Sequence, residues 1–524
     1  MKATKAPLPE RIMDIWRVPE KRRLFGKILG GKMIGVTLVF GVIAVLGVTA
    51  AHAQDAGDVA TSSGLSVDDL INPINTMWTL IAAFLVFFMQ AGFMALEAGF
   101  ARERETNNIM LECIVDTCLC GILFWAIGFA FMFGSGNGLI GHEFFFLNGA
   151  PETYGTTGVA FPAFFLFQFA FADTCSTITS GAMVGRTGFV GDLLYSIVVS
   201  ALIYPILGHW IWGPDGWLYM MKTPMRDFAG STVVHTVGGF IALAGAIALG
   251  PRLGRKFKRD GGGMPPGHSM TLAAVGGVIL WFGWYGFNPG STLSALDMGG
   301  MGRVATNTTL AACAGGIVAM FLAYPSVKKW DTGLTINGFL AGLVAITAPC
   351  YFVNQFGAVV IGAIAAAIMY YGVKLLEYVR IDDPIGAVPV HGFCGIWGTL
   401  AIGLFATGAY SMPSGTGMDT TVDPVVGLFY GGGTAQLQSQ LIGSLTVTVV
   451  CFAAAMILMY AVKATGTLRI SRAGEIEGID IHEHGAPSYH MEVGAGTGYY
   501  IAPSLDPDSD VDVRSKRDVP QPAG

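Results

Sequence analysis

The sequence predicts an all-α polytopic membrane protein, and three observations lead to this prediction. Hydrophobic residues make up 52% of the 524 residues and charged residues only 13%, whereas a soluble domain usually carries about 25% charged residues. Apolar runs of about 20 residues recur along most of the chain, and each is long enough to cross a hydrocarbon core of roughly 30 Å. Glycine is abundant at 73 residues, which suits close packing between membrane helices. A soluble fold is therefore excluded.

The N-terminus has the pattern of a signal peptide. Residues 1–53 hold nine Lys or Arg against three acids, include a long uncharged stretch, and end in Ala51-His52-Ala53 before Gln54. This small-x-small ending predicts cleavage after Ala53, and an uncleaved first helix is the alternative. Both readings place Gln54 outside. Cleavage would change the net charge from −6 to −12, which argues against a nucleic-acid partner.

After the signal peptide, residues 54–463 are expected to form a transmembrane domain with eleven spans, and residues 464–524 a polar C-terminal tail. An odd number of spans puts the two ends of the mature chain on opposite sides of the membrane. The expected spans are 75–100, 108–134, 159–184, 190–212, 231–250, 270–289, 304–325, 334–352, 356–378, 391–409 and 437–462.

Basic residues in the connections predict the orientation. One set of connections holds only Lys222, Arg226 and Arg303. The positive-inside rule makes the other, richer set cytoplasmic, so the N-terminus is expected outside and the C-terminus inside. The protein is thus expected as a multi-pass protein of the inner (cytoplasmic) membrane, surrounded by membrane lipid. The richer set holds Arg102, Arg104, Arg186, Arg252, Arg255, Lys256, Lys258, Arg259, Lys328, Lys329, Lys374, Arg380, Lys463, Arg469 and Arg472.

An internal repeat divides the transmembrane domain. Asp227 precedes His235 by eight residues and Asp383 precedes His391 by eight, and both segments read D-x-x-G-x-x-x-x-H with Val before the His. The two copies are five spans apart, so they enter the membrane from opposite faces. This predicts an inverted repeat of spans 1–5 and 6–10, with the eleventh helix outside the symmetry and the substrate near the midplane.

The two repeated histidines are candidate pore residues. An ionisable group inside a membrane span costs several kcal/mol if it faces lipid, so it needs a partner or a task. Neutral imidazole both donates and accepts hydrogen bonds, so His235 and His391 are suited to share a proton along a narrow path. A lone membrane histidine is more often a packing group, but the repeated context favours a pair. Metal ligation is a third reading, although neither His has another His or an acid three or four residues further on.

The repeated aspartates are expected to act as helix caps. A carboxylate near the start of a span accepts hydrogen bonds from free N–H groups and favours the positive end of the helix dipole. Asp227 and Asp383 both have this position. Asp227 lies on the outer side, where it is also expected to shape the entrance.

Aromatic side chains on the outer side suggest a cation site. Trp210 and Trp212 close the fourth span, and an indole face attracts a small cation by about 1–2 kcal/mol when partly desolvated. The alternative is an ordinary aromatic belt at the membrane surface. Phe287 and Ser291 end the sixth span on the same face, and Phe171 in the third span is placed to meet Phe287 across the pore.

Cysteines and cofactor motifs add no further chemistry. The eight Cys lie in apolar runs without a C-x-x-C pair, so they are read as packing residues and not as disulfides or metal ligands. We expect no cofactor and no metal. Without a nucleophile–base pair or metal cluster, the chain is also not expected to be an enzyme.

Several long motifs together resemble one known family. They are residues 227–235, 284–291 and 390–398, together with 89–99 in the first span and 468–485 in the tail. These segments are similar to the ammonium transporters of the Amt/Rh family, in the bacterial-type Amt branch, and the similarity runs from about residue 75 to 489. The resemblance implies an eleven-helix protomer, a homotrimer with a pore in each subunit, and a possible PII-type regulator at the cytoplasmic tail.

The resemblance also implies roles for single residues. Ser231 departs from the family pattern, which usually has Gly there, and we expect the change to be tolerated. By position, the implied roles are an outer cation site at Trp212 and Ser291 with the Ala229 carbonyl nearby, a stacked gate of Phe171 and Phe287, a pore pair of His235 and His391, and an entrance shaped by Asp227.

These residues suggest a hypothesis for ammonium transport and nitrogen uptake. Moving a bare ammonium ion into a medium of low dielectric costs several kcal/mol, so a narrow apolar pore favours the neutral amine. The expected sequence is recruitment of the cation at the outer vestibule, deprotonation, and passage of ammonia along the two histidines. Two alternatives stay open: an ammonium sensor (transceptor) that signals through its tail, and an Rh-like gas channel.

Overall fold

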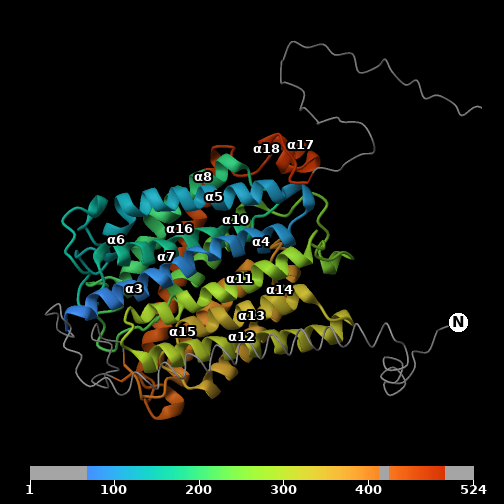
Figure 1. Ribbon diagram of the computed structural model, residues 1–524. Helices are drawn as coiled ribbons and strands as arrows, with labels where there is room; N and C mark the ends of the chain where they lie inside the picture. The colour runs from blue at the N-terminus through green and yellow to red at the C-terminus, as the bar shows by residue number, and fades with distance from the viewer. Residues whose placement is uncertain (1–67, 412–423, 490–524) are drawn as a thin grey trace, which may run out of the picture. The chain divides into compact units, whose positions relative to one another are not determined.

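The computed structural model describes residues 68–411 and 424–489, which are built almost entirely of helices (Figure 1). The expected signal peptide, residues 1–53, lies outside the described residues. The described residues from Ile71 onward form one compact unit. The helices are α3 (Asp68–Phe87), α4 (Met89–Phe100), α5 (Thr106–Leu123), α6 (Phe129–Phe133), α7 (Phe161–Gly181), α8 (Phe189–Val198), α9 (Tyr204–Trp212), α10 (Val237–Leu249), α11 (Met270–Phe287), α12 (Met298–Val327), α13 (Thr332–Thr347), α14 (Gln355–Val379), α15 (Cys394–Phe405), α16 (Ala435–Ala464), α17 (Arg472–Glu477) and α18 (Ile479–His484).

The predicted fold class, an all-α polytopic membrane protein, is confirmed. Within the described residues, ten continuous helical segments are long and apolar enough to cross a membrane. The helix at the eighth expected span, Thr332–Thr347, has 16 residues, which at 1.5 Å per residue is about 24 Å and shorter than the hydrocarbon core. The count of eleven spans therefore stays a prediction. The ten segments are Asp69–Phe100, Glu103–Phe133, Phe161–Gly181, Phe189–Trp212, Ser231–Leu249, Met270–Thr292, Met298–Val327, Gln355–Val379, Val388–Phe405 and Ala435–Ala464.

Several spans contain a π-helical turn, and proline explains one of them. The span from α8 to α9 widens at Val199–Ile203, shortly before Pro205 at the start of α9. Proline has no backbone N–H and its ring crowds the preceding turn, so the regular hydrogen-bond ladder cannot continue through it. The span that holds α15 begins with the turn Val388–Phe393, where Pro389 lies in the first helical turn and interrupts no hydrogen bond.

Glycines let neighbouring helices come close together. A Cβ added at Gly99 in α4 would lie 2.3 Å from the backbone nitrogen of Ala273 in α11, and one added at Gly276 would lie 2.3 Å from that of Leu96. The backbones of α4 and α11 are thus in direct contact, as in other small-residue interfaces between membrane helices. Beside this pair, α12, α13 and α14 pack against one another and form one side of the unit (Figure 1).

Two π-helical turns cross at the centre of the helices. The turn Ser231–Thr236 leads into α10, and the turn Val388–Phe393 leads into α15. Each contacts the other and also the helix that follows the other. At the crossing, a Cβ added at Gly239 would lie 2.3 Å from the backbone nitrogen of Gly392. This reciprocal crossing brings the two repeated segments face to face.

The first part of the tail packs on the helix ends at one face of the unit. Its two short helices, α17 and α18, lie close to the start of α5 and to α8 (Figure 1). The Asp480 carboxylate accepts hydrogen bonds from the backbone N–H groups of Asn107 and Asn108 at 3.0 and 2.9 Å. Arg104 donates to the Ile476 carbonyl at 2.7 Å. Asp480 is therefore an N-terminal cap for α5, although it lies far away in the sequence.

Candidate functional site

Asp227 holds the loop that leads to the first pore histidine. Its Oδ1 accepts hydrogen bonds from the N–H groups of Gly230 and Ser231 at 2.8 and 3.0 Å. Its Oδ2 accepts from Thr232 and Val233 at 2.8 and 3.0 Å. Burial raises the pKa of the Asp227 carboxyl above its ordinary value, while these four N–H groups favour the charged form. The loop turns at Gly230, whose φ of +113° strongly favours glycine.

Asp383 has the same arrangement in the second copy of the repeat. Its oxygens accept hydrogen bonds from the N–H groups of Gly386 and Ala387, both at 3.0 Å, and of Val388 at 2.9 Å. Gly386 has a φ of +80°. Burial raises the pKa of Asp383 to about 6, opposed by these N–H groups. The two aspartates therefore cap matching turns, as their positions in the repeat predict.

The turns bring the two histidines together. The Nδ1 atoms of His235 and His391 are 3.2 Å apart, and the ring centroids are 5.2 Å apart. Both side chains are buried, at 0% and 7% exposure. Neutral rings at this distance share one proton, so one Nδ1 donates while the other accepts, and the two Nε2 atoms differ in protonation. The Nε2 of His235 has no hydrogen-bond partner in the described part of the chain.

A column of stacked rings connects the histidines to the outer side. Phe171 and Phe287 stack with centroids 4.0 Å apart and ring planes 20° apart. Phe287 in turn stacks on His235 at 5.4 Å. Trp212 meets Phe171 edge-on at 6.0 Å. Both phenylalanines are at most 1% exposed, so the rings close the path in this structure.

Above the rings lies an open cavity of about 530 Å³. Its lining includes four of the predicted residues: Phe171, Trp212, Asp227 and Ser291. Trp212 is held by a hydrogen bond from its Nε1 to the Asp227 carbonyl at 2.7 Å. Ala229 and Phe287 are fully buried and are not part of the cavity lining. The cavity therefore gathers the predicted aromatic and hydroxyl groups of the outer site, without Ala229.

The hydroxyl of Ser291 is oriented by its own helix end. Its Oγ donates to the carbonyl of Phe287 at 2.8 Å. Because the single hydroxyl proton is used in this bond, the lone pairs of Oγ remain for a donor in the cavity. Ser291 can thus accept a hydrogen bond from a cationic N–H group. A bare alkali ion offers no such hydrogen.

Ser231, the departure from the family pattern, makes a local link. Its Oγ donates to the Val344 carbonyl at 2.8 Å and accepts from the N–H group of Ala348 at 2.7 Å. The hydroxyl thereby bridges the C-terminal end of α13, where the helix stops. The serine fits the site without an unpaired polar atom.

Two residues near the path had no role in the sequence analysis. Trp284 stacks on His235 at 5.2 Å with ring planes 20° apart, and its Nε1 donates to Thr347 Oγ1 at 2.9 Å. Gln168 lines the outer cavity with an Oε1 that has no partner among the described residues. Trp284 lies in the same aromatic motif as Phe287, so that motif was the available signal. Gln168 is the polar residue one helical turn before Phe171.

Five buried carboxyls within the helices were also missed. They come from α4, α5, α7 and α8, are at most 4% exposed, and have no Lys or Arg partner in the described part of the chain. One contact among them is a hydrogen bond from Ser180 Oγ to Glu97 at 3.2 Å. Acids inside apolar runs were the signal that sequence reasoning did not use. These residues are Glu97, Glu112, Asp116, Asp173 and Asp192.

The described residues contain no group of three or more His, Cys, Asp or Glu placed to hold a metal ion. The two histidines face each other, and no third ligand stands with them.

Comparison with known proteins gives one consistent family. The model of the Ammonium Transporter Family matches residues 77–489. The chain is 44% identical to "Ammonium transporter Amt2" of Archaeoglobus fulgidus, over 80% of this chain and 88% of that protein. It is 38% identical to "Ammonium transporter 1 member 3" of Solanum lycopersicum, over 79% of this chain and 93% of that protein.

Solved structures agree with this result. A structure titled "Sensor Amt Protein" matches with a TM-score of 0.72 at 36% identity, and the match covers 80% of this chain and all of that one. Mep2 of Candida albicans matches with a TM-score of 0.69 at 27% identity, over 80% and 90% of the two chains.

Proposed function

Because this chain belongs to the ammonium transporter family, a family of multi-pass membrane transporters and not of enzymes, we propose that it conducts ammonium through the ring-lined path between its two repeated histidines. The observation that carries the proposal is the unbroken series of contacts from the outer cavity to the histidines. Phe171 borders the cavity, stacks on Phe287 at 4.0 Å, and Phe287 stacks on His235 at 5.4 Å.

Recruitment takes place in the outer cavity. The indole of Trp212 attracts a cation through its ring face. Ser291 accepts a hydrogen bond from the ion, because its own proton is used at the Phe287 carbonyl. Asp227 holds the backbone around the entrance through four N–H groups and is not itself the ligand. Ammonium is thus favoured over potassium by hydrogen bonding, although the two ions are of similar charge and size.

Passage beyond the phenylalanines requires a neutral species. The Phe171 and Phe287 rings are fully buried and apolar, and an unpaired cation among them would lose its hydration without compensation. Ammonium gives its proton to water in the open outer cavity, and neutral ammonia passes after the rings separate. His235 and His391 then offer ammonia a donor and an acceptor, and they also provide a route for a proton along their shared Nδ1 contact.

The test is a current measurement on proteoliposomes of the purified protein. An ammonium jump is applied, with K⁺ and Na⁺ jumps as controls and an internal pH dye in the same vesicles. A transient current specific to ammonium means that charge crosses. Alkalinisation inside the vesicles without current means conduction of neutral ammonia. If vesicles with correctly inserted protein show neither a current nor alkalinisation, the transport proposal is refuted.

A second candidate function, ammonium sensing, is favoured by one specific observation. The tail is ordered against the helices: Asp480 caps α5, and Glu475 accepts from the N–H group of Leu253 beyond the end of α10. α10 carries the π turn of His235, so a shift at the histidines would reach the tail. The neighbour titled "Sensor Amt Protein" has the same fold. Ammonium-dependent hydrogen exchange in residues 468–485 would support a sensor, and unchanged exchange would argue against it.

Assembly and placement follow as further proposals from the family. We propose a homotrimer in the inner membrane, with the N-terminus outside and the tail inside. A PII-type regulator is the proposed partner at that tail. Pull-down of such a regulator by the full chain, and its loss after deletion of residues 464–524, would support this partner. Mass measurement of the detergent-solubilised protein tests the trimer.

A further inference from the structure

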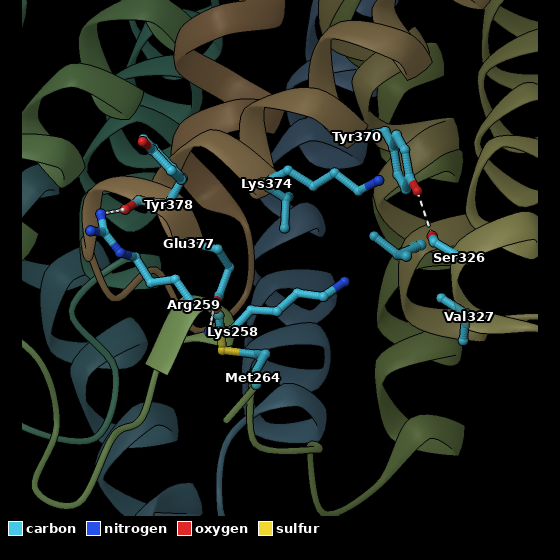
Figure 2. A pocket seen from close by; sticks show the side chains of 12 residues that line it. Lys258, Arg259, Met264, Ser326, Val327, Tyr370, Lys374, Glu377 and Tyr378 are labelled. Atoms are coloured by element: carbon cyan, nitrogen blue, oxygen red, sulfur yellow. Dashed lines mark hydrogen bonds between the residues drawn. The ribbon is translucent and has the colours of Figure 1, made fainter. Parts of the chain in front are cut away.

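A second cavity, of about 590 Å³, lies away from the transport path (Figure 2). It is formed by the C-terminal ends of α12 and α14, the first turn of α13, and the loop around η6 (Lys258–Asp260). Its volume falls in the range of roughly 300–1,000 Å³ that is typical of small-molecule sites. The distribution of basic residues predicts that this end of the helices faces the cytoplasm.

The cavity has an excess of positive charge. Its lining holds three basic residues, Lys258, Arg259 and Lys374, and one acid, Glu377. Glu377 is already used, because it forms a salt bridge with Arg255 and accepts from the backbone N–H of Lys258 at 3.1 Å. The salt bridges among the described residues leave the ammonium groups of Lys258 and Lys374 without an acidic partner. These two lysines therefore carry the positive charge in the cavity that no acid neutralises.

Two hydroxyl groups face the lysines. Tyr370 and Ser326 share a hydrogen bond between their oxygens at 2.6 Å. The Lys374 ammonium lies 4.2 Å from the centroid of the Tyr370 ring. Figure 2 shows the ends of Lys258 and Lys374 reaching into the space in front of this pair. Ser326 Oγ also lies 3.1 Å from the Ala323 carbonyl, so the pair offers at most one hydroxyl proton. The donor set facing the space is therefore chiefly the two ammonium groups, which suit a phosphate group.

The surroundings of the cavity indicate where such a phosphate comes from. On the outer surface of α14, Tyr371, Leu375 and Tyr378 are 60%, 51% and 65% exposed. At the same end of α12, Tyr324 stacks on Trp330 at 4.3 Å, and the Trp330 side chain is 59% exposed. Exposed aromatic and aliphatic side chains at the end of a span mark the boundary between hydrocarbon and headgroups. The cavity thus opens at the depth of lipid phosphates, and its remaining wall is apolar, with Val327, Leu334 and Val373.

We propose that this cavity binds the phosphate headgroup of an anionic phospholipid from the cytoplasmic leaflet. Lys258 and Lys374 pair with the phosphate, and Tyr370 with Ser326 bonds to a phosphate or glycerol oxygen. The apolar wall covers the first part of the acyl chains. Arg259 is not free for the same task, because its Nη1 donates to the Tyr378 carbonyl at 2.9 Å. The site is independent of ammonium transport, and the failure of one proposal leaves the other standing.

The experiment is native mass spectrometry of the full chain purified in detergent, titrated with dioctanoyl phosphatidylglycerol. Each basic residue near a membrane surface adds roughly fivefold to the affinity for an anionic lipid, so we expect the double variant Lys258→Gln/Lys374→Gln to bind roughly 10- to 30-fold more weakly. The matched control is Lys328→Gln/Lys329→Gln, which removes the same charge just beyond α12 but outside the cavity lining. The control should bind like the wild type.

Further measurements distinguish the proposed lipid from other occupants of the cavity. Tyr370→Phe keeps the ring beside Lys374, and it should weaken binding less than the double lysine variant. Equal binding of dioctanoyl phosphatidylcholine, or equal loss in both lysine pairs, would overturn the proposal. If millimolar inorganic phosphate alone fills the site as well as the lipid does, the site belongs to a soluble anion. A change of oligomeric state in the lipid-free double variant would instead make the cavity a contact between copies of the chain.

Discussion

The direction of one hydroxyl proton decides what the outer cavity selects. Ser291 donates to the Phe287 carbonyl, so it meets the cavity as an acceptor. In the proposed cation site, the Trp212 ring attracts any small cation, and the Ser291 oxygen adds a directional hydrogen bond that only an ion with N–H groups can donate. The proposal therefore assigns most of the selectivity to the hydroxyl.

Replacement of this hydroxyl should lower selectivity more than transport. In Ser291→Ala, we expect the preference for ammonium over K⁺ at the outer site to fall about five- to tenfold, because a hydrogen bond to a charged group contributes roughly 1.5–3 kcal/mol and water replaces part of it. The measurement is the inhibition of ammonium current by external K⁺. Ser291→Thr, which keeps the hydroxyl, is the control. Unchanged inhibition in Ser291→Ala would show that the hydroxyl does not select.

The histidine pair leads to a different expectation. In His235→Ala, ammonia loses a partner between the gate and His391, and the shared proton of the pair is lost with it. We expect specific ammonium current to fall at least tenfold, while ammonium binding at the outer cavity stays within about twofold, since a single neutral hydrogen bond contributes roughly 0.5–1.5 kcal/mol. Current and binding are measured on the same preparation. Wild-type current in this variant would exclude an essential role for the pair.

At this scale the sequence predicted several of the contacts that the structure shows, and the path itself stays a proposal. The repeat predicted that His235 and His391 would form a pair. The four-residue spacing at the end of the sixth span placed Phe287 one helical turn before Ser291. Trp284 was missed because the sequence does not tell which ring of an aromatic run stacks on a histidine of another span. Ala229 could not be placed either, since a single backbone carbonyl carries no sequence signal of its own.

Among the elements, the connection after α10 is fixed by a buried ion cluster. Asp382 pairs with Arg252 at 2.8 Å and Arg255 at 3.1 Å, and its backbone carbonyl accepts from Arg186 at 2.6 Å. Burial alone would favour the neutral acid, but the hydrogen bonds and charges of Arg252 and Arg186 hold the pKa of Asp382 below its ordinary value. The cluster joins the connection after α10 to the segment that precedes the second pore turn.

Asp382→Asn should destabilise the protein strongly, because it leaves buried guanidinium groups without their counter-charge. We expect a loss of about 3–5 kcal/mol in the free energy of unfolding at pH 7. The folded pKa is lowered, so the stabilisation is complete above the unfolded value of about 3.9 and is lost as the pH falls through the lower folded value. The difference between wild type and variant should thus be constant from pH 5 to 8. Thermal unfolding in detergent over this range measures it, and a difference that shrinks above pH 5 would contradict the assignment.

Element boundaries were predicted less well than element existence. The eighth span was expected over residues 334–352, but α13 ends at Thr347. Pro349 accounts for this early end, because it has no backbone N–H and so interrupts the helical hydrogen-bond ladder, although Ala348 before it keeps helical geometry. The π turns are harder to foresee. Pro205 indicates one of them, whereas the turns at Phe124–Gly128 and Ser231–Thr236 contain no proline and depend on tertiary packing.

In the molecule as a whole, the tail is joined to the start of the second span. Three contacts do this: Asp480 at the N-terminus of α5, Arg104 at the Ile476 carbonyl, and His484 at Asn108, 2.8 Å away. The sequence marked the tail as family-like but gave no indication of where it would dock. Long-range polar contacts have no periodicity, so they were beyond the reach of pattern analysis.

Loss of the cap should release the tail without unfolding the pore. In Asp480→Ala we expect faster hydrogen exchange across residues 468–485, because a lost N-terminal cap costs about 0.5–2 kcal/mol. Exchange in α10 and α15 should be unchanged. Asp480→Asn, which keeps a capping side chain, is the control. If residues 468–485 exchange no faster in the alanine variant than in the wild type, Asp480 does not hold the tail.

The cap on α5 also has a consequence for the order in which the protein is made. α5 belongs to the second span, yet the carboxylate that caps its first turn is encoded 372 residues after Asn108. During synthesis the N–H groups of Asn107 and Asn108 therefore have no Asp480 partner until the tail has been translated. A chain that stops early carries every span but leaves this helix end open. The finished protein thus differs from a chain without the tail at this helix end, as well as at the contacts that Arg104, Asn108 and Leu253 make with the tail.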